Sequence, residues 1–245
     1  WRISSSGQLP EKYVRALVLF EDRYFFQHPG VNPLALLRAI LQNVRAGEVV
    51  SGGSTISMQT IRMARGNRSR NIWQKGIEAL GAFQMELVEK KEEILQLYAF
   101  NAPFGGNVVG LEAAAWRYFG RSPASLSWAE AATLAVLPNA PALMHPGRNR
   151  EALRIKRNKL LLHLKEEGII SSMDYELSMA EGLPERPLPL PQVADQLVES
   201  FHAQGLGRVN THLDFHLQEQ VLRILDRHHK EQSGNQVNNL AVLVL

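Results

Sequence analysis

Glu21 is a carboxylate placed on a helix face that is otherwise apolar. The run Glu11–Gln27 predicts one helix, with Pro10 in its first turn, and Glu21 lies inside its hydrophobic stripe. Asp22 and Arg23 project to other sides, where they can stay solvated. The stripe itself consists of Val14, Leu17, Val18 and Phe25. Because desolvation raises the pKa of a carboxyl group and makes it a better base, Glu21 is either a general base or a buried, hydrogen-bonded structural residue.

A glycine-containing turn leads into a second predicted helix. The segment Ser51–Arg62 opens with two glycines, offers Ser54 or Thr55 as the helix N-cap, and continues into a helix that carries Gln59 and Arg62. Such a junction directs free backbone N–H groups and the positive end of the helix dipole at one place, which suits an anion such as a phosphate. The alternative is that the turn only caps the helix. No Gly-Lys-Ser/Thr follows, so the segment is not a P-loop.

A basic run precedes a third predicted helix. The segment Arg65–Leu80 feeds a helix on which Lys75 and Glu78 lie one turn apart, beside the small residues Ala79 and Ala82. The apolar stripe of this helix lies on another side and consists of Ile72, Gly76, Leu80, Phe83 and Leu87. Lys75 and Glu78 either reach a shared cleft or form an ordinary surface ion pair.

Five segments carry a resemblance to the peptidoglycan glycosyltransferases, because they occur in the order and at the spacing of that family's five motifs. They are EDRYFFQHPG from Glu21, GGSTISMQ from Gly52, QKGIE from Gln74, KEEILQLYAFNAPFGGNVVGLEAAAWRYFG from Lys91, and AATLAVLPNAP from Ala131. The chain thus resembles the membrane-bound glycosyltransferase domain of class A penicillin-binding proteins over residues 9–180. The NAPFGGN loop is similar to the 1C-type branch of the family.

This resemblance implies an activity and a chemical mechanism. The family polymerises lipid II, an undecaprenyl-pyrophosphate-linked disaccharide-pentapeptide, into β-1,4 glycan strands. The growing strand is the donor and lipid II is the acceptor. The position of Glu21 implies that it takes the proton from the acceptor 4-hydroxyl, which attacks the anomeric carbon with inversion. The lipid pyrophosphate is already a good leaving group, so it needs charge neutralisation more than a strong acid.

The resemblance also implies roles for further residues. Glu78 matches the family's second catalytic glutamate, which assists the departing pyrophosphate or its cation. The other residues that match substrate-contacting positions are Asp22, Phe25 and His28 around the cleft, Gly53, Ser54, Thr55 and Gln59 in the loop and helix, and Arg62, Arg70 and Lys75 at the pyrophosphate.

Three positions depart from the family pattern, namely Met58, Gln74 and Phe100. Each replaces a hydrogen-bonding group expected at the donor side of the cleft. Since both Glu21 and Glu78 are retained, we expect activity with reduced phosphate affinity or an altered substrate preference.

The rest of residues 1–180 predicts a mainly α, lysozyme-like domain with a smaller membrane-facing lobe. Helices are expected over Leu111–Phe119 before Gly120, Trp128–Leu137 after a Ser127-x-x-Glu130 capping box and before Pro138, and Ile155–Glu167 before Gly168. The amphipathic segment Val31–Val44 is shorter than the ~18 to 20 residues of a membrane span. In family members the corresponding region dips into the bilayer.

The composition changes after residue 180. Residues 181–208 are predicted as a linker, because four prolines fall between Pro184 and Pro191 and favour an extended chain; a helix-like run, Val193–Gln204, follows them. Residues 209–245 are expected to be the truncated start of an α/β transpeptidase region, with a helix over Thr211–His229 and a buried strand over 239–245. No Ser-x-x-Lys transpeptidase motif follows within the chain. His212 and His216 have a metal-compatible spacing, but no HExxH motif accompanies them and we predict no metal site.

Composition limits the partners. The net charge of +3 favours an anionic partner, and the lack of any nucleic-acid-binding signature argues against nucleic acid. The absence of cysteine excludes disulfides. The resemblance implies lipid II, the glycan strand and the membrane surface as partners, a moenomycin-type inhibitor in the donor site, and other cell-wall proteins. It implies no obligatory cofactor, although Mg²⁺ or Mn²⁺ can assist. We expect the outer face of the bacterial cytoplasmic membrane as the location, with an N-terminal anchor missing from these residues.

Two other functions remain open. The first is a lysozyme-like glycan-cleaving enzyme, which needs a glutamic acid to protonate a poor leaving group but no pyrophosphate site. The cluster of Arg62, Arg70 and Lys75 argues against it. The second is a catalytically weak module that binds lipid II or holds partner proteins, which the three departures favour and the two retained glutamates oppose.

Overall fold

The computed structural model describes residues 8–46, 52–67, 71–139, 149–185, 187–189, 194–206, 209, 211–232, 234 and 241–242. The chain divides into two compact units, Trp1–Pro189 and Leu190–Leu245. The predicted domain limits at residues 180 and 208 stay predictions. The described part contains no β-strand beyond one isolated bridge between Pro103 and Val109, which confirms the mainly α fold.

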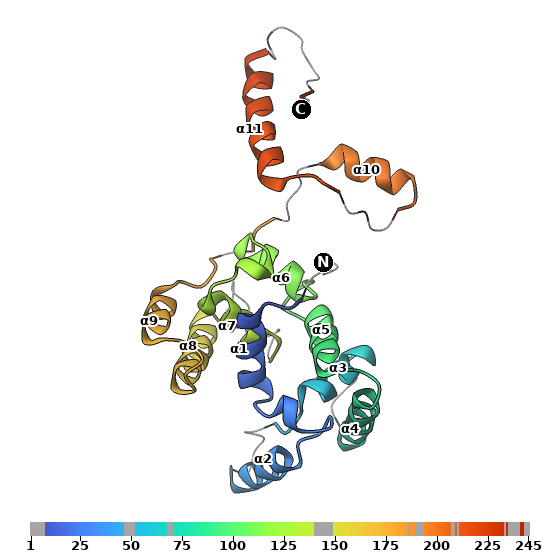
Figure 1. Ribbon diagram of the computed structural model, residues 1–245, viewed down its shortest axis with the longest axis vertical. Coiled ribbons are helices and arrows are strands. Elements are labelled where there is room, and N and C mark those ends of the chain that lie inside the picture. Colours follow the sequence, from blue (N-terminus) through green and yellow to red (C-terminus); the bar gives the residue numbers. More distant parts are fainter. Residues whose placement is uncertain are drawn as a thin grey trace. The chain divides into compact units, whose positions relative to one another are not determined.

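The first unit consists of nine α-helices and three short 3₁₀ turns among its described residues (Figure 1). The α-helices are α1 Glu11–Glu21, α2 Pro33–Ala46, α3 Ile56–Ala64, α4 Ile72–Glu86, α5 Lys91–Asn101, α6 Leu111–Phe119, α7 Trp128–Val136, α8 Arg150–Glu166 and α9 Ser172–Ala180. The 3₁₀ turns are η1 Phe25–Gln27, η2 Pro123–Ser125 and η3 Leu137–Asn139.

Helix α7 lies at the centre of the core and packs against α1, α6, α8 and α9 (Figure 1). From Ala129 to Val136 every residue of α7 is buried, as expected for a helix that is apolar on all sides. Its predicted capping box is confirmed, since Ser127 Oγ accepts from Glu130 N and Ser127 N donates to the Glu130 carboxylate. A second contact group places α3 against both α4 and α5. These two groups bring the C-terminal end of α1 close to α3.

Local signals predicted the helix ends well in several places. Thr55 caps α3, because its Oγ1 accepts from Met58 N. Gly120 and Gly168 follow α6 and α8 with left-handed backbone, as predicted. Helix α7 ends one residue early, at Val136, and Pro138 lies within η3. Helices α2 and α8 are shifted relative to the predictions, α8 beginning at Arg150 rather than Ile155.

The prediction of one helix over Glu11–Gln27 is wrong, because α1 ends at Glu21. Asp22 adopts an extended backbone, with φ of −161°, and its side chain is buried instead of solvated. Its carboxylate accepts from the backbone N–H of Ile56 and contacts His28. These tertiary hydrogen bonds outweigh the helical periodicity that continues beyond Glu21 in the sequence.

The apolar stripe of α4 does not enter the core. Leu80, Phe83 and Leu87 are exposed, and Trp73 at the start of the helix is 82% exposed. The buried side of α4 instead carries Glu78 and Ala82. On α2, Leu34, Leu37 and Leu41 are also exposed, whereas Leu36 is half-buried. Within the ranges that the structure describes, no helix combines the length and apolar character needed to cross a bilayer.

The described residues of the segment from Leu183 to Pro189 form a strap that lies against other parts of the first unit. Its described residues are not helical, as predicted for a proline-rich segment. Arg150 donates to the carbonyls of Leu183 and Pro184, and Leu188 N donates to Arg117 O at 2.6 Å. The strap is therefore held at one end by the Arg150 side chain and at the other by a backbone hydrogen bond.

The second unit contains α10 Asp195–Ala203 and α11 Phe215–Gln232. Both were predicted, although α11 begins at Phe215 rather than Thr211. The predicted buried strand over residues 239–245 falls mostly outside the described residues. Its two described residues, Ala241 and Val242, are exposed and not in a strand, which contradicts that prediction for them. The assignment of residues 209–245 to a transpeptidase region stays a prediction.

Candidate active site

Glu21 lies at the C-terminal end of α1, facing α3. Gln59 Nε2 on α3 donates a hydrogen bond of 2.7 Å to Glu21 Oε2, while Glu21 Oε1 is buried without a partner. Burial raises the pKa of the Glu21 carboxyl, and the hydrogen bond from Gln59 and the charges of Lys156 and Arg62 oppose this rise. A carboxylate with a raised pKa and one oxygen held in place has the properties of a general base.

Arg62 and Glu78 join α3 to α4. Arg62 Nε lies 2.9 Å from Glu78 Oε1, and Arg62 Nη2 lies 3.0 Å from Glu78 Oε2. The Glu78 residue is only 4% exposed. Of the two alternatives for Glu78, the surface ion pair with Lys75 is not the one that forms, because the packing of α4 on α3 buries the carboxylate against Arg62. Arg62 Nη2 also lies 3.5 Å from Ser54 Oγ, so the guanidinium connects the second and third sequence motifs.

The turn after Glu21 is anchored by a buried polar network. His28 Nε2 lies 3.0 Å from both carboxylate oxygens of Asp22, and Thr55 Oγ1 donates to Gly30 O. Lys91 donates to His28 O at 2.7 Å, and its ammonium lies 4.3 Å from the centre of the Phe25 ring. Asp22, Phe25 and His28, which were predicted to shape the cleft, are all buried.

The N-terminus of α3 holds an anionic group of the protein itself. Ile56 N donates to Asp22 Oδ2 at 3.2 Å, and Met58 N donates to Thr55 Oγ1. Two of the orphan N–H groups that a phosphate would use are thus already bonded. An anion at this end of the site depends more on side chains than on the helix terminus.

Two glycines allow the backbones here to approach closely. A Cβ on Gly53 would lie 2.8 Å from Leu36 Cα. Gly30 has φ of +88°, and a Cβ there would lie 2.7 Å from the backbone carbonyl of Ala82. Gly30 and Gly53 therefore let the loops flanking α2 pack against their neighbours.

The remaining predicted contacts are placed in part. Lys75 is half-buried on α4, and Arg70 lies outside the described residues. Among the departures, Met58 is 2% exposed in the core and Gln74 Oε1 accepts from Arg65 Nη2 at 3.4 Å. Phe100 is half-buried, and the neighbouring Asn101 donates its amide to Leu97 O of its own helix. The side chain of Met58 thus packs inward.

Three residues near Glu21 were missed by sequence reasoning. Lys156 on α8 is half-buried, donates to Asn139 Oδ1 at 2.9 Å, and acts electrostatically on Glu21. Burial lowers the pKa of Lys156, and the charge of Glu21 opposes this. Tyr13 on α1 and Tyr98 on α5 are buried, and the charge of Glu21 acts on both hydroxyls. Tyr13 precedes Glu21 by two helical turns, but Lys156 and Tyr98 lie far along the chain and carry no local signal.

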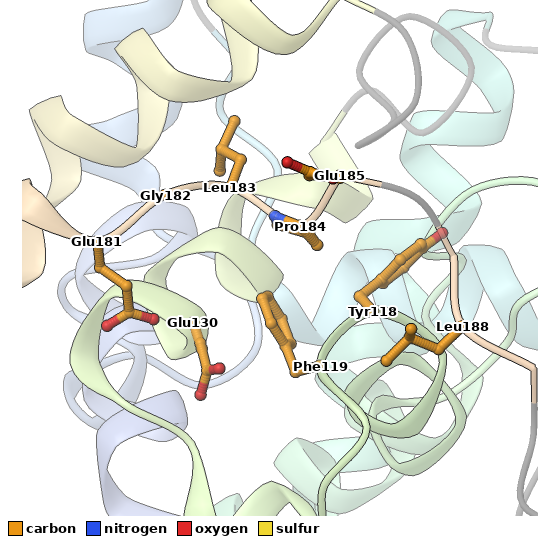
Figure 2. Close-up of a pocket in the computed structure, with 9 residues that line it drawn as sticks. All are labelled: Tyr118, Phe119, Glu130, Glu181, Gly182, Leu183, Pro184, Glu185 and Leu188. Atoms are coloured by element: carbon orange, nitrogen blue, oxygen red, sulfur yellow. The ribbon is translucent and has the colours of Figure 1, made fainter.

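A separate pocket of about 370 Å³ lies between the strap and helices α6 and α7 (Figure 2). Glu130 and Glu181 lie side by side in it, and Ser127 contacts both carboxylates. Its other lining residues are Tyr118, Phe119, Gly182, Leu183, Pro184, Glu185 and Leu188. The pocket contains neither Glu21 nor Glu78. One of its walls is formed by the strap. Across the described ranges, no group of three or more His, Asp or Glu side chains is arranged to hold a metal ion.

Comparisons with known proteins point to one family. The family model described as Transglycosylase matches residues 2–165. Penicillin-binding protein 1C of Escherichia coli is 39% identical over 217 residues, which cover 86% of this chain and 27% of that protein. Penicillin-binding protein 1A of Aquifex aeolicus is 41% identical over 73% of this chain and 25% of its own length.

A crystal structure of penicillin-binding protein 1A from Haemophilus influenzae aligns with a TM-score of 0.45 and 21% identity, over 85% of this chain and 22% of that chain. The chain spans about a quarter of the length of the curated relatives it matches. The family match, with which these identities agree, shows that the chain belongs to the transglycosylase family of peptidoglycan-synthesising penicillin-binding proteins.

Proposed function

We propose that the chain polymerises lipid II into β-1,4 glycan strands, with Glu21 as the general base. The observation that carries this proposal is the state of Glu21. Its carboxyl has a pKa raised by burial, one oxygen is bonded to Gln59, and the Arg62–Glu78 pair lies on the neighbouring helices. These are the requirements for taking a proton from a sugar hydroxyl beside a leaving group that carries negative charge.

In the proposed step the oxygen of the acceptor 4-hydroxyl attacks the anomeric carbon of the donor strand. Its proton passes to Glu21, and the bond between the anomeric carbon and the pyrophosphate oxygen breaks with its electron pair on that oxygen. Undecaprenyl pyrophosphate leaves, and the anomeric carbon is inverted. Base catalysis of this type contributes about 10²- to 10⁴-fold to a rate.

The cationic side of the site supports the departing pyrophosphate. Arg62 and Lys75 lie on α3 and α4, and Arg70 is proposed to join them. Glu78 holds the guanidinium of Arg62 through two hydrogen bonds, so its part in the reaction is to orient this cation. Because Ile56 N is already bonded to Asp22, the side chains rather than the α3 terminus neutralise the charge.

We also propose where the reaction takes place. The exposed apolar side chains of α2 and α4 suit contact with lipid, which agrees with a substrate that carries a polyprenyl tail. We place the chain at the outer face of the bacterial cytoplasmic membrane, where other cell-wall proteins are its neighbours. A moenomycin-type inhibitor should compete in the donor site. No obligatory cofactor is proposed, and Mg²⁺ or Mn²⁺ should at most assist the pyrophosphate.

The test is incubation of the purified chain with labelled lipid II in detergent, followed by separation of polymer from monomer. The parent should form polymer and Glu21→Gln should lose at least ~100-fold. A matched control is Glu112→Gln, which removes another half-buried glutamate of raised pKa that accepts from Trp116 Nε1 away from the site. Equal activity of Glu21→Gln and the parent would overturn the role of Glu21.

A second candidate function is a binding module that holds lipid II without polymerising it. Two contacts favour this candidate: Arg62 pairs with Glu78, and the N-terminus of α3 is bonded to Asp22. Both contacts reduce the number of hydrogen-bond donors that remain available to a phosphate. Measurable lipid II binding by the parent, with no polymer from it, would support this candidate. Cleavage of preformed glycan would instead support a hydrolase.

A further inference from the structure

Among the described residues, four buried side-chain atoms lack a hydrogen-bond partner. One is His28 Nδ1, and the other three are Glu21 Oε1 and the hydroxyl oxygens of Tyr13 and Tyr98. Tyr13 is 0% exposed and Tyr98 is 1% exposed. Buried polar groups in folded proteins are nearly always bonded to protein or to ordered water, so three unpaired atoms in one region need an explanation.

The three groups act on one another. The charge of Glu21 raises the pKa of both tyrosine hydroxyls, after the larger effect of burial, and the Tyr13 hydroxyl acts on that of Tyr98. Tyr13 and Tyr98 also belong to the same buried apolar cluster, on α1 and α5. The groups therefore share one region of the interior, yet none of them bonds directly to another.

The chemistry of the three atoms identifies what can link them. An ionised carboxylate only accepts hydrogen bonds, whereas each tyrosine hydroxyl can donate one. A water molecule accepts from hydroxyl donors and donates to a carboxylate oxygen, so it satisfies all three groups at once. Buried water typically makes about three hydrogen bonds of this kind.

We propose that ordered water behind Glu21 links its Oε1 to the hydroxyls of Tyr13 and Tyr98, and that the two tyrosines are positioning residues of the base. This inference rests on the proposed function of Glu21. The water fixes Oε1 on the interior side, so that Oε2, bonded to Gln59, remains directed toward the acceptor. A donor to the carboxylate also favours its ionised form, which is the form that takes the proton.

Several other groups also shift the pKa of Glu21. Burial raises the pKa of Glu21 and Asp22 adds to the rise, while Gln59, Lys156 and Arg62 lower it. Loss of the water-held hydrogen bonds would remove one further stabiliser of the charged form. The pKa of Glu21 should then rise, and the acidic limb of the rate profile should move to higher pH.

The experiment compares Tyr13→Phe, Tyr98→Phe and the double variant with the parent in lipid II polymerisation between pH 5 and 9. We expect the double variant to lose about 5- to 10-fold in rate at the acidic end and to approach the parent at the alkaline end. The matched control is Tyr118→Phe, which removes a buried hydroxyl that donates to Phe104 O at 2.7 Å. This control should leave the pH profile unchanged.

Two readouts do not depend on activity. A ¹³C NMR titration of the Glu21 carboxyl, identified by its loss in Glu21→Gln, should show a higher pKa in the double variant than in the parent. A high-resolution crystal structure of the parent should show water within hydrogen-bond distance of Glu21 Oε1 and a tyrosine hydroxyl. An unchanged titration, or a dry site, would overturn the inference.

The outcomes also separate this inference from the proposed function. If the parent makes no polymer, the proposed function fails, whereas the titration and the crystal structure still decide whether water links the three groups. If the phenylalanine variants do not fold, the crystal structure of the parent decides alone.

Discussion

Arg62 and Glu78 face each other across the contact of α3 with α4 in a two-pronged ion pair, with distances of 2.9 and 3.0 Å. Both side chains are largely buried, at 14% and 5% exposed. Breaking a buried pair leaves one uncompensated charge, which costs more than the pair itself contributes. The catalytic role proposed for this pair is therefore coupled to its structural role.

The Arg62–Glu78 pair predicts that Glu78→Gln weakens both folding and polymerisation. We expect a loss of about 3 kcal/mol in the free energy of unfolding, because Arg62 loses its carboxylate in a buried position. Urea denaturation measures this loss. The control is Glu151→Gln, whose exposed pairing with Arg154 should contribute less than about 1 kcal/mol. Equal effects of the two substitutions would contradict the prediction.

Glu21 should destabilise the folded chain at neutral pH. Burial raises its pKa above the ordinary value of 4.5, so the unfolded chain releases this proton first as pH rises. The stability associated with Glu21 is thus present below pH 4.5 and is lost as pH rises through the folded-state pKa. Glu21→Gln removes this loss and should be more stable than the parent at pH 8 but not at pH 4.

Urea denaturation of the parent and Glu21→Gln at a series of pH values tests this point. The control is Glu176→Gln, which alters an exposed carboxylate on α9. A constant difference for Glu21→Gln would show that its carboxyl titrates normally.

The parts of this site that could be predicted from sequence are those set by neighbours along the chain. The Ser127 capping box and the Gly120 helix end follow from local hydrogen bonding and were predicted. The cap of α3 was narrowed to Ser54 or Thr55, and Thr55 is the one that caps the helix. The end of α1 was missed, because Asp22 bonds to Ile56, which lies 34 residues further along the chain. Periodicity carries no information about such a bond.

The same limit applies to side-chain partners. Glu78 has Lys75 one turn away on its own helix, yet the packing of α3 on α4 gives it Arg62. Lys156 and Tyr98 approach Glu21 only after α8 and α5 have packed. The family resemblance located the glutamates, but the groups that tune them depend on tertiary contacts that residue types alone do not reveal.

Asp22 should couple the end of α1 to the start of α3. Asp22→Asn keeps an acceptor for Ile56 N but places an amide N–H group near His28 Nε2, which faces both oxygens of the native carboxylate. We expect a loss of about 1–3 kcal/mol in unfolding free energy. A double-mutant cycle of Asp22→Asn with His28→Gln should give a coupling of at least about 1 kcal/mol. Additive effects would show that the two side chains act independently.

The strap should depend on Arg150. Arg150 donates to the carbonyls of Leu183, Pro184 and Glu185, so Arg150→Ala should release this segment. Cleavage after Glu185 by a glutamate-specific protease should become several-fold faster, because proteolysis requires local opening. Arg154→Ala is the control, since Arg154 lies on the same helix and pairs with Glu151. Identical cleavage rates for the two variants would contradict a clamp at Arg150.

Lys156 on α8 should tune Glu21, the proposed base. Its positive charge lowers the pKa of Glu21, and it is held by Asn139 Oδ1. In Lys156→Met the pKa of Glu21 should rise, and the acidic limb of the polymerisation profile should move to higher pH while the alkaline rate falls less. Lys159→Met is the control, because Lys159 is exposed on the same helix and should leave the profile in place. A loss of rate that is the same at every pH would mean that Lys156 binds substrate instead of tuning Glu21, since removal of a binding contact does not change which protonation state of the base is populated.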